Sequence, residues 1–440
     1  MSDEYLKIVD NIMNQFSSMK SIQESIWKFF TEEKCDKPCG ADLNIVVLNG
    51  PCNGFGDLVF AVKLRNYLIE WYGSTVTLVT THKSGMEKLG VYDSIRLTGP
   101  DQPNCKSFAE FKLQDDIETQ DLIFVAPVYV GNKDKIMKDV KTLFPYSNKL
   151  NTFLLSEYNN TDNFGNHFTF STGVGEDRDG LLLTTIDTKS VRPLTLKNPF
   201  ALVYITNQIC KKECDKCILS FVDMVVKKYN KKEMFHNFDI VIPSWFTDDD
   251  HFFIREKITE NVKEEYPNVV LVTTTEKIYM SRSDDKKDKK LTFRCDVLPV
   301  TNEEMINLIR NSIKDILVTG DQSITDVLSC CSYKNIFYQI VPWKKNFAGN
   351  LARYMPNIYL KDQKTSCGTI DALEYKSDYK TFVEEWDFRT RSRPKMNGII
   401  LSAIYIKQDK DIHNLYKIIL KSKTKDEVIE KIQSIQKKVF

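Results

Sequence analysis

One stretch near the end of the chain decides the fold: Leu317–Asn346, which reads LVTGDQSITDVLSCCSYKNIFYQIVPWKKN. The apolar strand Ile316–Val318 runs into the turn Thr319–Ser323, and a helix over Ile324–Cys330 leads to a second strand, Ile336–Ile340. A strand that ends in a glycine-polar turn at a helix start presents main-chain N–H groups and the positive end of the helix dipole. The stretch therefore predicts a phosphate-binding turn at the carboxyl edge of a parallel sheet, where open α/β folds bind their ligands.

Length and composition indicate a globular protein of more than one domain. The chain has 440 residues, which favours two domains with extensions. Hydrophobic residues make up 42% and charged residues 28%, which is ordinary for a globular protein, and the net charge of +1 gives no general attraction to nucleic acid or anionic membrane. No apolar run reaches about 18 residues, so we expect no membrane span.

The amino terminus and the cysteines bear on the compartment. Met1–Glu4 is acidic and no apolar signal core follows it. The eleven cysteines are an odd number in a large chain without a signal, which favours reduced thiols. We expect a soluble, intracellular, cytoplasmic protein.

The order of the expected elements predicts the α/β class, with two doubly wound Rossmann-like domains. Residues 1–40 form a helical N-terminal extension, 41–197 and 198–362 form the two domains, and 363–440 form a helical segment that packs back across the domains. Strand and helix alternate in both domains, which implies parallel sheets covered on both faces.

The bounds of the expected elements follow from apolar periodicity. The first domain has strands at 43–48, 75–80, 121–126 and 152–156, with helices at 58–72, 84–89 and 133–143. The second has strands at 201–205, 238–242, 269–272, 293–298, 316–318 and 336–340, with helices at 217–228, 252–264, 302–312 and 324–330. Residues 281–290 are charged and without apolar residues, which favours an exposed loop.

A glycine-rich turn follows the first strand and contains Asn53, Gly54, Phe55, Gly56 and Asp57. Glycine permits positive φ and a close approach of the backbone to a ligand, but the spacing differs from the dinucleotide-binding fingerprint. Asp57 stands at the helix start, and two interpretations have similar weight. It is either an N-cap that accepts main-chain N–H groups or a general base whose carboxylate such donors keep ionised.

The later turn has the same two kinds of interpretation. Ser323 or Asp321 can cap the helix in an ordinary strand-to-helix loop, or the turn can bind phosphate. The second is favoured because a glycine-polar turn opens both halves of the chain, and two such turns facing each other would frame one cleft. Upstream, Leu298–Asn302 is an apolar strand end without an acidic residue, which suits either a nucleobase or a plain loop.

Two further motifs suggest metals. Cys210, Cys214 and Cys217 have the spacing with which radical S-adenosylmethionine enzymes hold a four-iron cluster, but they lie among lysines in the middle of the chain. Zinc would need a fourth ligand that this spacing does not supply. Asp248–His251 resembles a metal-binding acidic motif, but its place before an expected helix favours acidic residues at a helix N-terminus. We therefore expect no metal site.

The pairing of the turn Asn53–Asp57 with the turn Thr319–Ser323 resembles the GT-B-fold glycosyltransferases. The nearest likeness is to the arginine rhamnosyltransferases that modify a translation elongation factor, and a more distant one is to sugar transferases of peptidoglycan precursor synthesis. In the former, a turn of the D-N-Y-G-D kind carries catalytic carboxylates, and a Gly-acidic-acidic-Ser turn holds the nucleotide diphosphate. The resemblance implies a nucleotide-diphosphate sugar as donor, no required cofactor, and an acceptor that is a protein, glycan, lipid or nucleic acid.

The resemblance assigns roles to individual positions. Asp57 would deprotonate the acceptor and Asp321 would contact the donor sugar or ribose. Lys344 or Lys345 would help main-chain dipoles, including the turn Thr319-Gly320, to stabilise the leaving diphosphate in an inverting, metal-independent transfer. Gln322 and Ser323 would donate hydrogen bonds to the pyrophosphate. Val300 and Asn302 would lie near the nucleobase.

The sequence departs from that family at three positions. Asn53 stands in place of an aspartate, Thr319 in place of a basic residue before Gly320, and Gln322 in place of a second acid. The identities of the sugar, of the donor's nucleobase and of the acceptor are therefore left open. The alternatives are a nucleotide-sugar 2-epimerase of the same fold and a non-catalytic member that binds a glycan or a partner.

Overall fold

The computed structural model describes residues 40–409 except 53, 102–106, 114–116, 118–119, 130–132, 146, 148–150, 161–168, 185–195, 210, 286–287, 356–357, 366–367 and 376–378. The helical extension expected over residues 1–40 lies outside this range apart from Gly40. The chain divides into two compact units. Unit 1 comprises the described residues up to Met86, Tyr92–Leu182 and those from Trp386 onward, and unit 2 comprises Glu87–Val91 and Leu183–Glu385.

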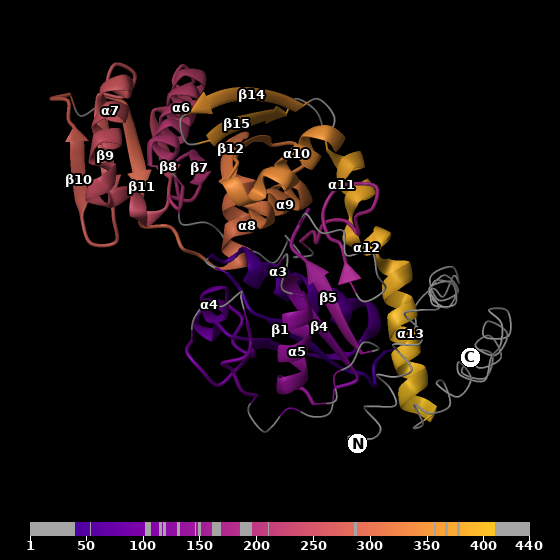
Figure 1. The fold of residues 1–440 in the computed structure, drawn as a ribbon. Helices are drawn as coiled ribbons and strands as arrows, with labels where there is room; N and C mark the ends of the chain where they lie inside the picture. The colour runs from indigo at the N-terminus through magenta and orange to yellow at the C-terminus, as the bar shows by residue number, and fades with distance from the viewer. Residues whose placement is uncertain are drawn as a thin grey trace. The chain divides into compact units, whose positions relative to one another are not determined.

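Unit 1 contains a six-stranded parallel sheet in the order β3-β2-β1-β4-β5-β6. Its elements are β1 (Asn44–Asn49), α3 (Gly56–Tyr72), β2 (Thr75–Thr80), α4 (Lys83–Lys88), β3 (Ile95–Arg96), β4 (Leu122–Val128), α5 (Lys133–Leu143), β5 (Thr152–Ser156) and β6 (Thr169–Phe170) (Figure 1). From the central strand β1, strands β2 and β3 follow toward one edge of the sheet, and strands β4, β5 and β6 follow toward the other edge. The strand order therefore reverses between β1 and β4, which is the switch point where such sheets bind ligands.

Helices cover both faces of this sheet, which is why its central strands read as continuous apolar runs. Helix α5 packs with Val46, Leu48, Ile123 and Val125 in one hydrophobic cluster. Helix α3 contacts β1, β2 and β4 and has no residue in that cluster, so it lies on the other face. Two later helices, α12 (Phe388–Arg391) and α13 (Arg393–Asp409), also belong to unit 1.

Unit 2 contains a seven-stranded sheet in the order β10-β9-β11-β8-β7-β12-β13, parallel except for β10 at one edge. Its strands are β7 (Phe200–Tyr204), β8 (Asn237–Val241), β9 (Asn268–Val272), β10 (Lys277–Ser281), β11 (Lys290–Arg294), β12 (Asp315–Thr319) and β13 (Asn335–Gln339). Its main helices are α6 (Lys211–Tyr229), α7 (Phe252–Val262), α8 (Asn302–Asn311), α9 (Asp321–Cys330) and α10 (Lys345–Tyr354). Here the strand order reverses between β7 and β12.

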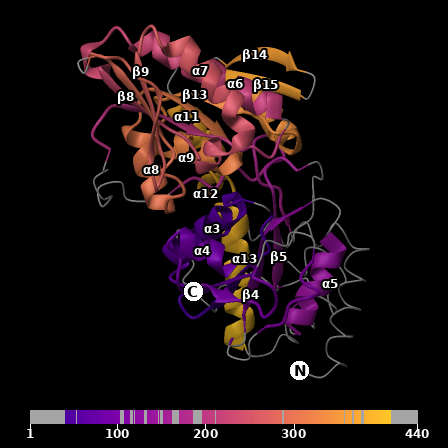
Figure 2. The same ribbon diagram turned by 90° about the vertical axis from the view of Figure 1, so that its left-hand side faces the viewer.

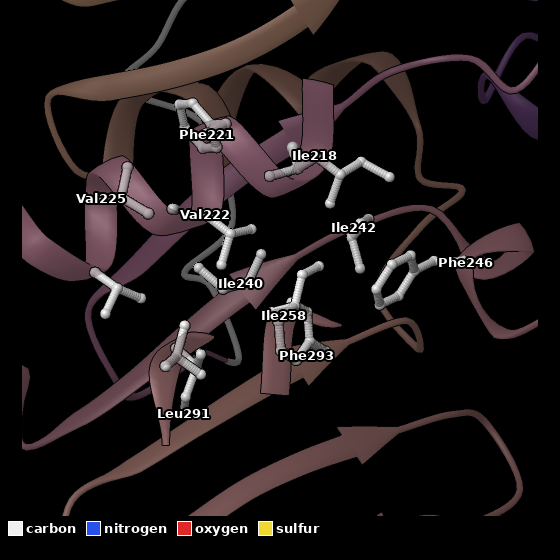
Figure 3. Close-up of a cluster of buried hydrophobic side chains, with 14 of the residues drawn as sticks. Ile218, Phe221, Val222, Val225, Ile240, Ile242, Phe246, Ile258, Leu291 and Phe293 are labelled. Carbon is white, nitrogen blue, oxygen red and sulfur yellow. The ribbon is translucent and has the colours of Figure 1, made fainter. Parts of the chain in front are cut away.

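The core of unit 2 forms where α6 and α7 pack on one face of the sheet. In Figure 3, Ile218 and Val222 of α6 lie over Ile240 of β8 and Ile242, which directly follows β8, and all four are fully buried. Helices α8 and α9 contact β7, β12 and β13, and Figure 2 shows α8 on the side of the sheet away from α6 and α7. Each helix buries its apolar stripe against the sheet.

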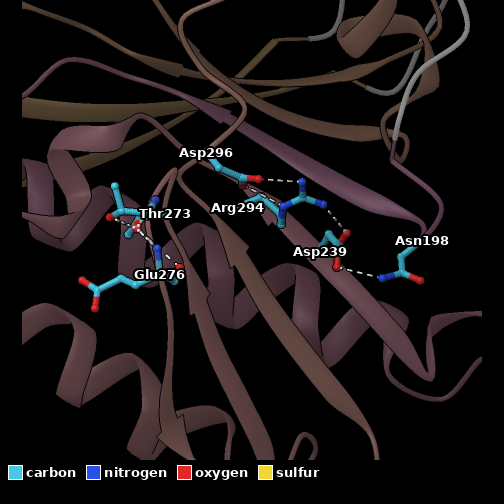
Figure 4. Close-up of polar contacts among 7 residues, drawn as sticks. Asn198, Asp239, Thr273, Glu276, Arg294 and Asp296 are labelled. Carbon is cyan, nitrogen blue, oxygen red and sulfur yellow. Dashed lines mark hydrogen bonds and ion pairs between the residues drawn. The ribbon is translucent and has the colours of Figure 1, made fainter.

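Asp239 is one of the polar residues that are buried within the unit 2 sheet. The carboxylate of Asp239 in β8 accepts a hydrogen bond from Asn198 Nδ2 at 3.1 Å and lies 3.7 Å from Arg294, which also binds Asp296 (Figure 4). Burial raises the pKa of Asp239, and the nearby Arg294 opposes this. The amide and guanidinium therefore compensate a buried carboxylate.

The structure confirms the α/β class with two doubly wound Rossmann-like sheets. Several details differ from the sequence prediction. The helical segment expected from residue 363 begins later, because β14 (Ile358–Thr365) and β15 (Gly368–Tyr375) pair as an antiparallel hairpin before α11 (Lys380–Trp386). These stretches contain isoleucines, threonines and tyrosines, which favour strands. Among the described residues, no helix is long and apolar enough to cross a membrane.

Candidate functional site

The switch point of unit 1 is organised by Asn49, the last residue of β1. Its buried amide nitrogen donates hydrogen bonds to Ala126 O in β4 at 2.8 Å and to Asp57 O at 3.1 Å. Its amide oxygen accepts from Thr80 Oγ1 of β2 at 3.2 Å. One side chain thus ties the ends of three strands to the first turn of α3.

Asp57 lies in that first turn, and the structure excludes one of its two interpretations. The N-cap of α3 is Phe55, with no side-chain cap hydrogen bond, so the N-cap interpretation of Asp57 is wrong. Instead, Asp57 Oδ2 accepts hydrogen bonds from Cys52 N at 2.9 Å and from the hydroxyl of Tyr129 at 2.5 Å. Tyr129 directly follows β4, so the contact joins the two strands on either side of the switch point.

The turn before Asp57 has the conformation for which glycine is suited. Gly54 has φ +106°, and a Cβ built there would meet no atom within 4 Å. Gly54 is exposed, Phe55 and Gly56 are partly exposed, and Asn53 lies outside the described residues. Cys52 is disulfide-bonded, so the expectation of reduced thiols is wrong at this position. Among the described residues, Cys214, Cys217, Cys295 and Cys331 carry free thiols.

The later turn is built around Gly320 and Asp321. Gly320 has φ +76° and is the N-cap of α9, with no side-chain cap hydrogen bond, so neither Ser323 nor Asp321 is the cap. Asp321 Oδ1 accepts from Gln322 N at 2.8 Å, and Asp321 Oδ2 forms an ion pair of 2.6 Å with Lys344 Nζ. Both partners are buried. Lys344 therefore places a positive charge beside this turn, where the resembling family has a basic residue and this chain has Thr319.

The strand ends around this turn are fixed by polar contacts. Thr319 Oγ1 donates to Gln339 O, the last residue of β13, at 3.0 Å. The fully buried side-chain amide of Gln339 pairs with both main-chain groups of Thr206, which follows β7, at 3.0 and 3.1 Å. The carboxyl ends of β7, β12 and β13 are thus linked at the switch point of unit 2.

The other predicted donor-site residues lie at the same edge of the sheet. Gln322 is buried in α9, and Ser323 is partly exposed. Val300 and Asn302 are partly exposed at the start of α8, where Thr301 and Glu304 form a capping box. Helix α8 thus begins with a side-chain cap, as a plain strand-to-helix loop would. Helix α9 begins at Gly320, and no side chain caps it.

The structure describes most of the residues of the two metal motifs. Cys214 and Cys217 belong to the buried face of α6, and burial raises the pKa of both thiols, that of Cys217 to about 12. Cys210 lies outside the described residues. Asp249–His251 form a short 3-10 turn before α7, and His251 Nδ1 lies 3.1 Å from Asp215. Within the described part of the chain, no group of three or more His, Cys, Asp or Glu residues can hold a metal ion.

Three site residues escaped the sequence analysis: Asn49, Tyr129 and Gln339. Asn49 and Tyr129 stand at or just after the ends of β1 and β4, which border the switch point of unit 1, and Gln339 ends β13, the neighbour of β12. A search for polar residues at the carboxyl ends of the expected strands would have found them. The sequence prediction placed the strand end at residue 126, so Tyr129 did not stand next to it. In the structure β4 continues to Val128, and Tyr129 directly follows it.

The comparisons with known proteins give weak similarity. No family model matches the sequence, and no curated protein matches it. One similar solved structure is an alpha-glucosyltransferase in complex with UDP and a 13-mer DNA containing a central A:G mismatch, with 10% identity, a TM-score of 0.31 and coverage of 68% of this chain and 80% of that one. Another is described as a UDP-N-acetylglucosamine 2-epimerase from Listeria monocytogenes, with 10% identity, a TM-score of 0.35 and coverage of 83% and 94%. Similarity at this level carries no argument about activity. The proposal below is therefore argued from the residues of the two turns.

Proposed function

We propose that this protein is a GT-B-type glycosyltransferase that takes a sugar from a nucleotide-diphosphate donor. The observation that carries the proposal is that both turns predicted from the sequence lie at the switch point of a doubly wound sheet, one in each unit. Such points are where open α/β sheets bind ligands.

The α9 turn is the proposed donor site. Its helix begins at Gly320 without a side-chain cap, and a Cβ at Gly320 would meet no atom within 4 Å, so a ligand can approach the backbone closely. Helix N-termini of this kind bind phosphate through main-chain N–H groups and the helix dipole. Lys344 adds a positive charge held beside the turn by Asp321. The donor's diphosphate would bind here, with Ser323 as a further hydrogen-bond donor.

Asp57 is the proposed general base for the acceptor. It does not cap α3, and two donors converge on one of its carboxylate oxygens. Donors of this kind favour the ionised form that a base requires before it accepts a proton. The acceptor oxygen or nitrogen would lose its proton to Asp57 as it attacks the anomeric carbon, with inversion, and the nucleotide diphosphate would leave.

The test is to incubate the purified protein with a panel of uridine, guanosine and thymidine diphosphate sugars and follow the products by NMR. We expect release of the nucleoside diphosphate from one of them, slow with water as acceptor, and loss of this release in Asp57→Ala. Conversion of the donor to an isomer without nucleotide release would identify the epimerase instead. Donors that all remain unchanged, with and without candidate acceptors, would contradict the proposal.

A further inference from the structure

We propose that Tyr129 is a positioning residue that orients the Asp57 carboxylate and keeps it ready to accept a proton. This inference rests on the proposed function, because it assigns a second residue to the site of the proposed base. The one observation from which it starts is the hydrogen bond between the Tyr129 hydroxyl and Asp57 Oδ2.

The fold brings the two residues together across the switch point. β1 and β4 are parallel neighbours, with Leu48 opposite Val125, so the loops that follow them leave the same edge of the sheet. The pairing of β4 with β5 shifts register between Val125 and Val128, just before Tyr129. Irregularities of this kind re-aim side chains beside functional sites.

The direction of the hydrogen bond is fixed by the chemistry of the two groups. Burial, and then the charge of Asp57, raises the pKa of Tyr129 well above its ordinary value, so the phenol keeps its proton and donates it. The Cys52 N–H donates to the same oxygen from the other side of the loop. A carboxylate with two donors on one oxygen is restrained in rotation, and hydrogen bonds to an ionised group are about twice as strong as neutral ones.

The α3 helix offers a matched control at its other end. Tyr72, its last residue, is buried and its hydroxyl donates to Asn397 Oδ1 at 2.7 Å. Tyr72→Phe and Tyr129→Phe thus each remove one tyrosine hydroxyl that donates a side-chain hydrogen bond in unit 1. Asp57 and Tyr72 lie near opposite ends of α3, about 22 Å apart at 1.5 Å per residue. Tyr129 contacts the proposed base, whereas Tyr72 lies at the other end of α3.

The experiment has two arms on the full chain. The first measures urea unfolding of Asp57→Ala, Tyr129→Phe and the double variant. We expect the double variant to lose less stability than the sum of the single variants, because each single variant already breaks the shared contact. Additive losses would overturn the inference whether or not the protein is an enzyme.

The second arm measures the pH profile of kcat/KM for nucleotide release. In Tyr129→Phe we expect the acidic limb to move to higher pH, because the carboxylate has lost a donor that favours its ionised form, and kcat to fall about tenfold with little change in KM for the donor. Tyr72→Phe should keep the wild-type profile. A Tyr129→Phe profile that superimposes on the wild type, in an enzyme that Asp57→Ala inactivates, would overturn this inference alone. Absence of turnover with every donor would instead contradict the proposed function.

Discussion

Lys344 and Asp321 form a buried ion pair at the start of α9, with 2.6 Å between Lys344 Nζ and Asp321 Oδ2. The pair joins the loop after β13 to the turn after β12, so it fixes the geometry of the proposed diphosphate site. A buried pair of this kind stabilises the fold only while both partners are present, because either charge alone is left without compensation.

The ion pair predicts a strongly non-additive response to substitution. We expect Lys344→Met and Asp321→Asn each to lower the free energy of unfolding by about 3 kcal/mol, whereas the double variant should lose less than either, since it leaves no uncompensated charge. Urea unfolding monitored by circular dichroism measures this. Single variants as stable as the wild type would show that the pair is not formed in solution.

Gly320 predicts a backbone effect at the same turn. Its φ of +76° disfavours any side chain, while the space around its Cβ is open, so Gly320→Ala should cost about 1–2 kcal/mol of stability through strain alone. Gly349 in α10 is the matched control, because its Cβ also meets no atom within 4 Å and its place in a helix favours alanine by about 0.5–1 kcal/mol. Equal effects of the two substitutions on the unfolding free energy would be inconsistent with the turn described.

Lys334 predicts an unusual dependence of stability on pH. It is buried, its ammonium group donates to the carbonyls of Arg310, Ser312 and Ile313 at the end of α8, and burial lowers its pKa to about 8. Between pH 8 and the ordinary lysine value of 10.5, the unfolded chain therefore binds more protons than the folded one, so stability conferred by this group rises with pH.

The measurement is the difference in unfolding free energy between the wild type and Lys334→Met at pH 7.5 and pH 9.5. We expect this difference to shift in favour of the wild type by at most about 1.4 kcal/mol per pH unit above pH 8. Tyrosines that titrate in the same range contribute equally to both proteins and cancel. A difference that is constant with pH would contradict the assignment.

The buried thiols predict slow reactivity. Because burial raises the pKa of Cys217 to about 12 and that of Cys214 further, both should react with a thiol reagent only after unfolding. Mass spectrometry of alkylated peptides, native against denatured, measures this. Rapid alkylation of both residues in the folded protein would contradict this prediction. Iron in protein purified without oxygen would support the iron-cluster interpretation of the motif.

Much of the fold follows from apolar periodicity. The expected bounds of β2, β5 and α5 agree with the structure, because each is a clearly bounded element with a strong pattern. Strands β3 and β6 have two residues each and are too short to produce a pattern. Helix α6 begins six residues before its expected start, because the charged residues of its first turns hide the apolar stripe.

The positions of the two glycine turns were predictable, whereas the side-chain contacts around them were not. The two glycine turns are visible in the sequence because positive φ restricts the residue type. The sequence left Asp57 between a cap and a base, because both roles suit a carboxylate at a helix start. The structure excludes the cap, and the contacts with Cys52 and Tyr129 could not be foreseen from the spacing. The pairing of Lys344 with Asp321 depends on how β13 lies beside β12, which spacing alone does not reveal.

The most direct test of the central claim is the melting temperature of the full chain with uridine, guanosine and thymidine diphosphates and their sugars. A ligand that binds only the folded state raises the melting temperature, by an amount equivalent to about 2.7 kcal/mol at 100 times its Kd. We predict stabilisation by one nucleotide class, abolished in Asp321→Ala with Ser323→Ala and retained in Tyr72→Phe. The same melting temperature with every nucleotide would contradict the account.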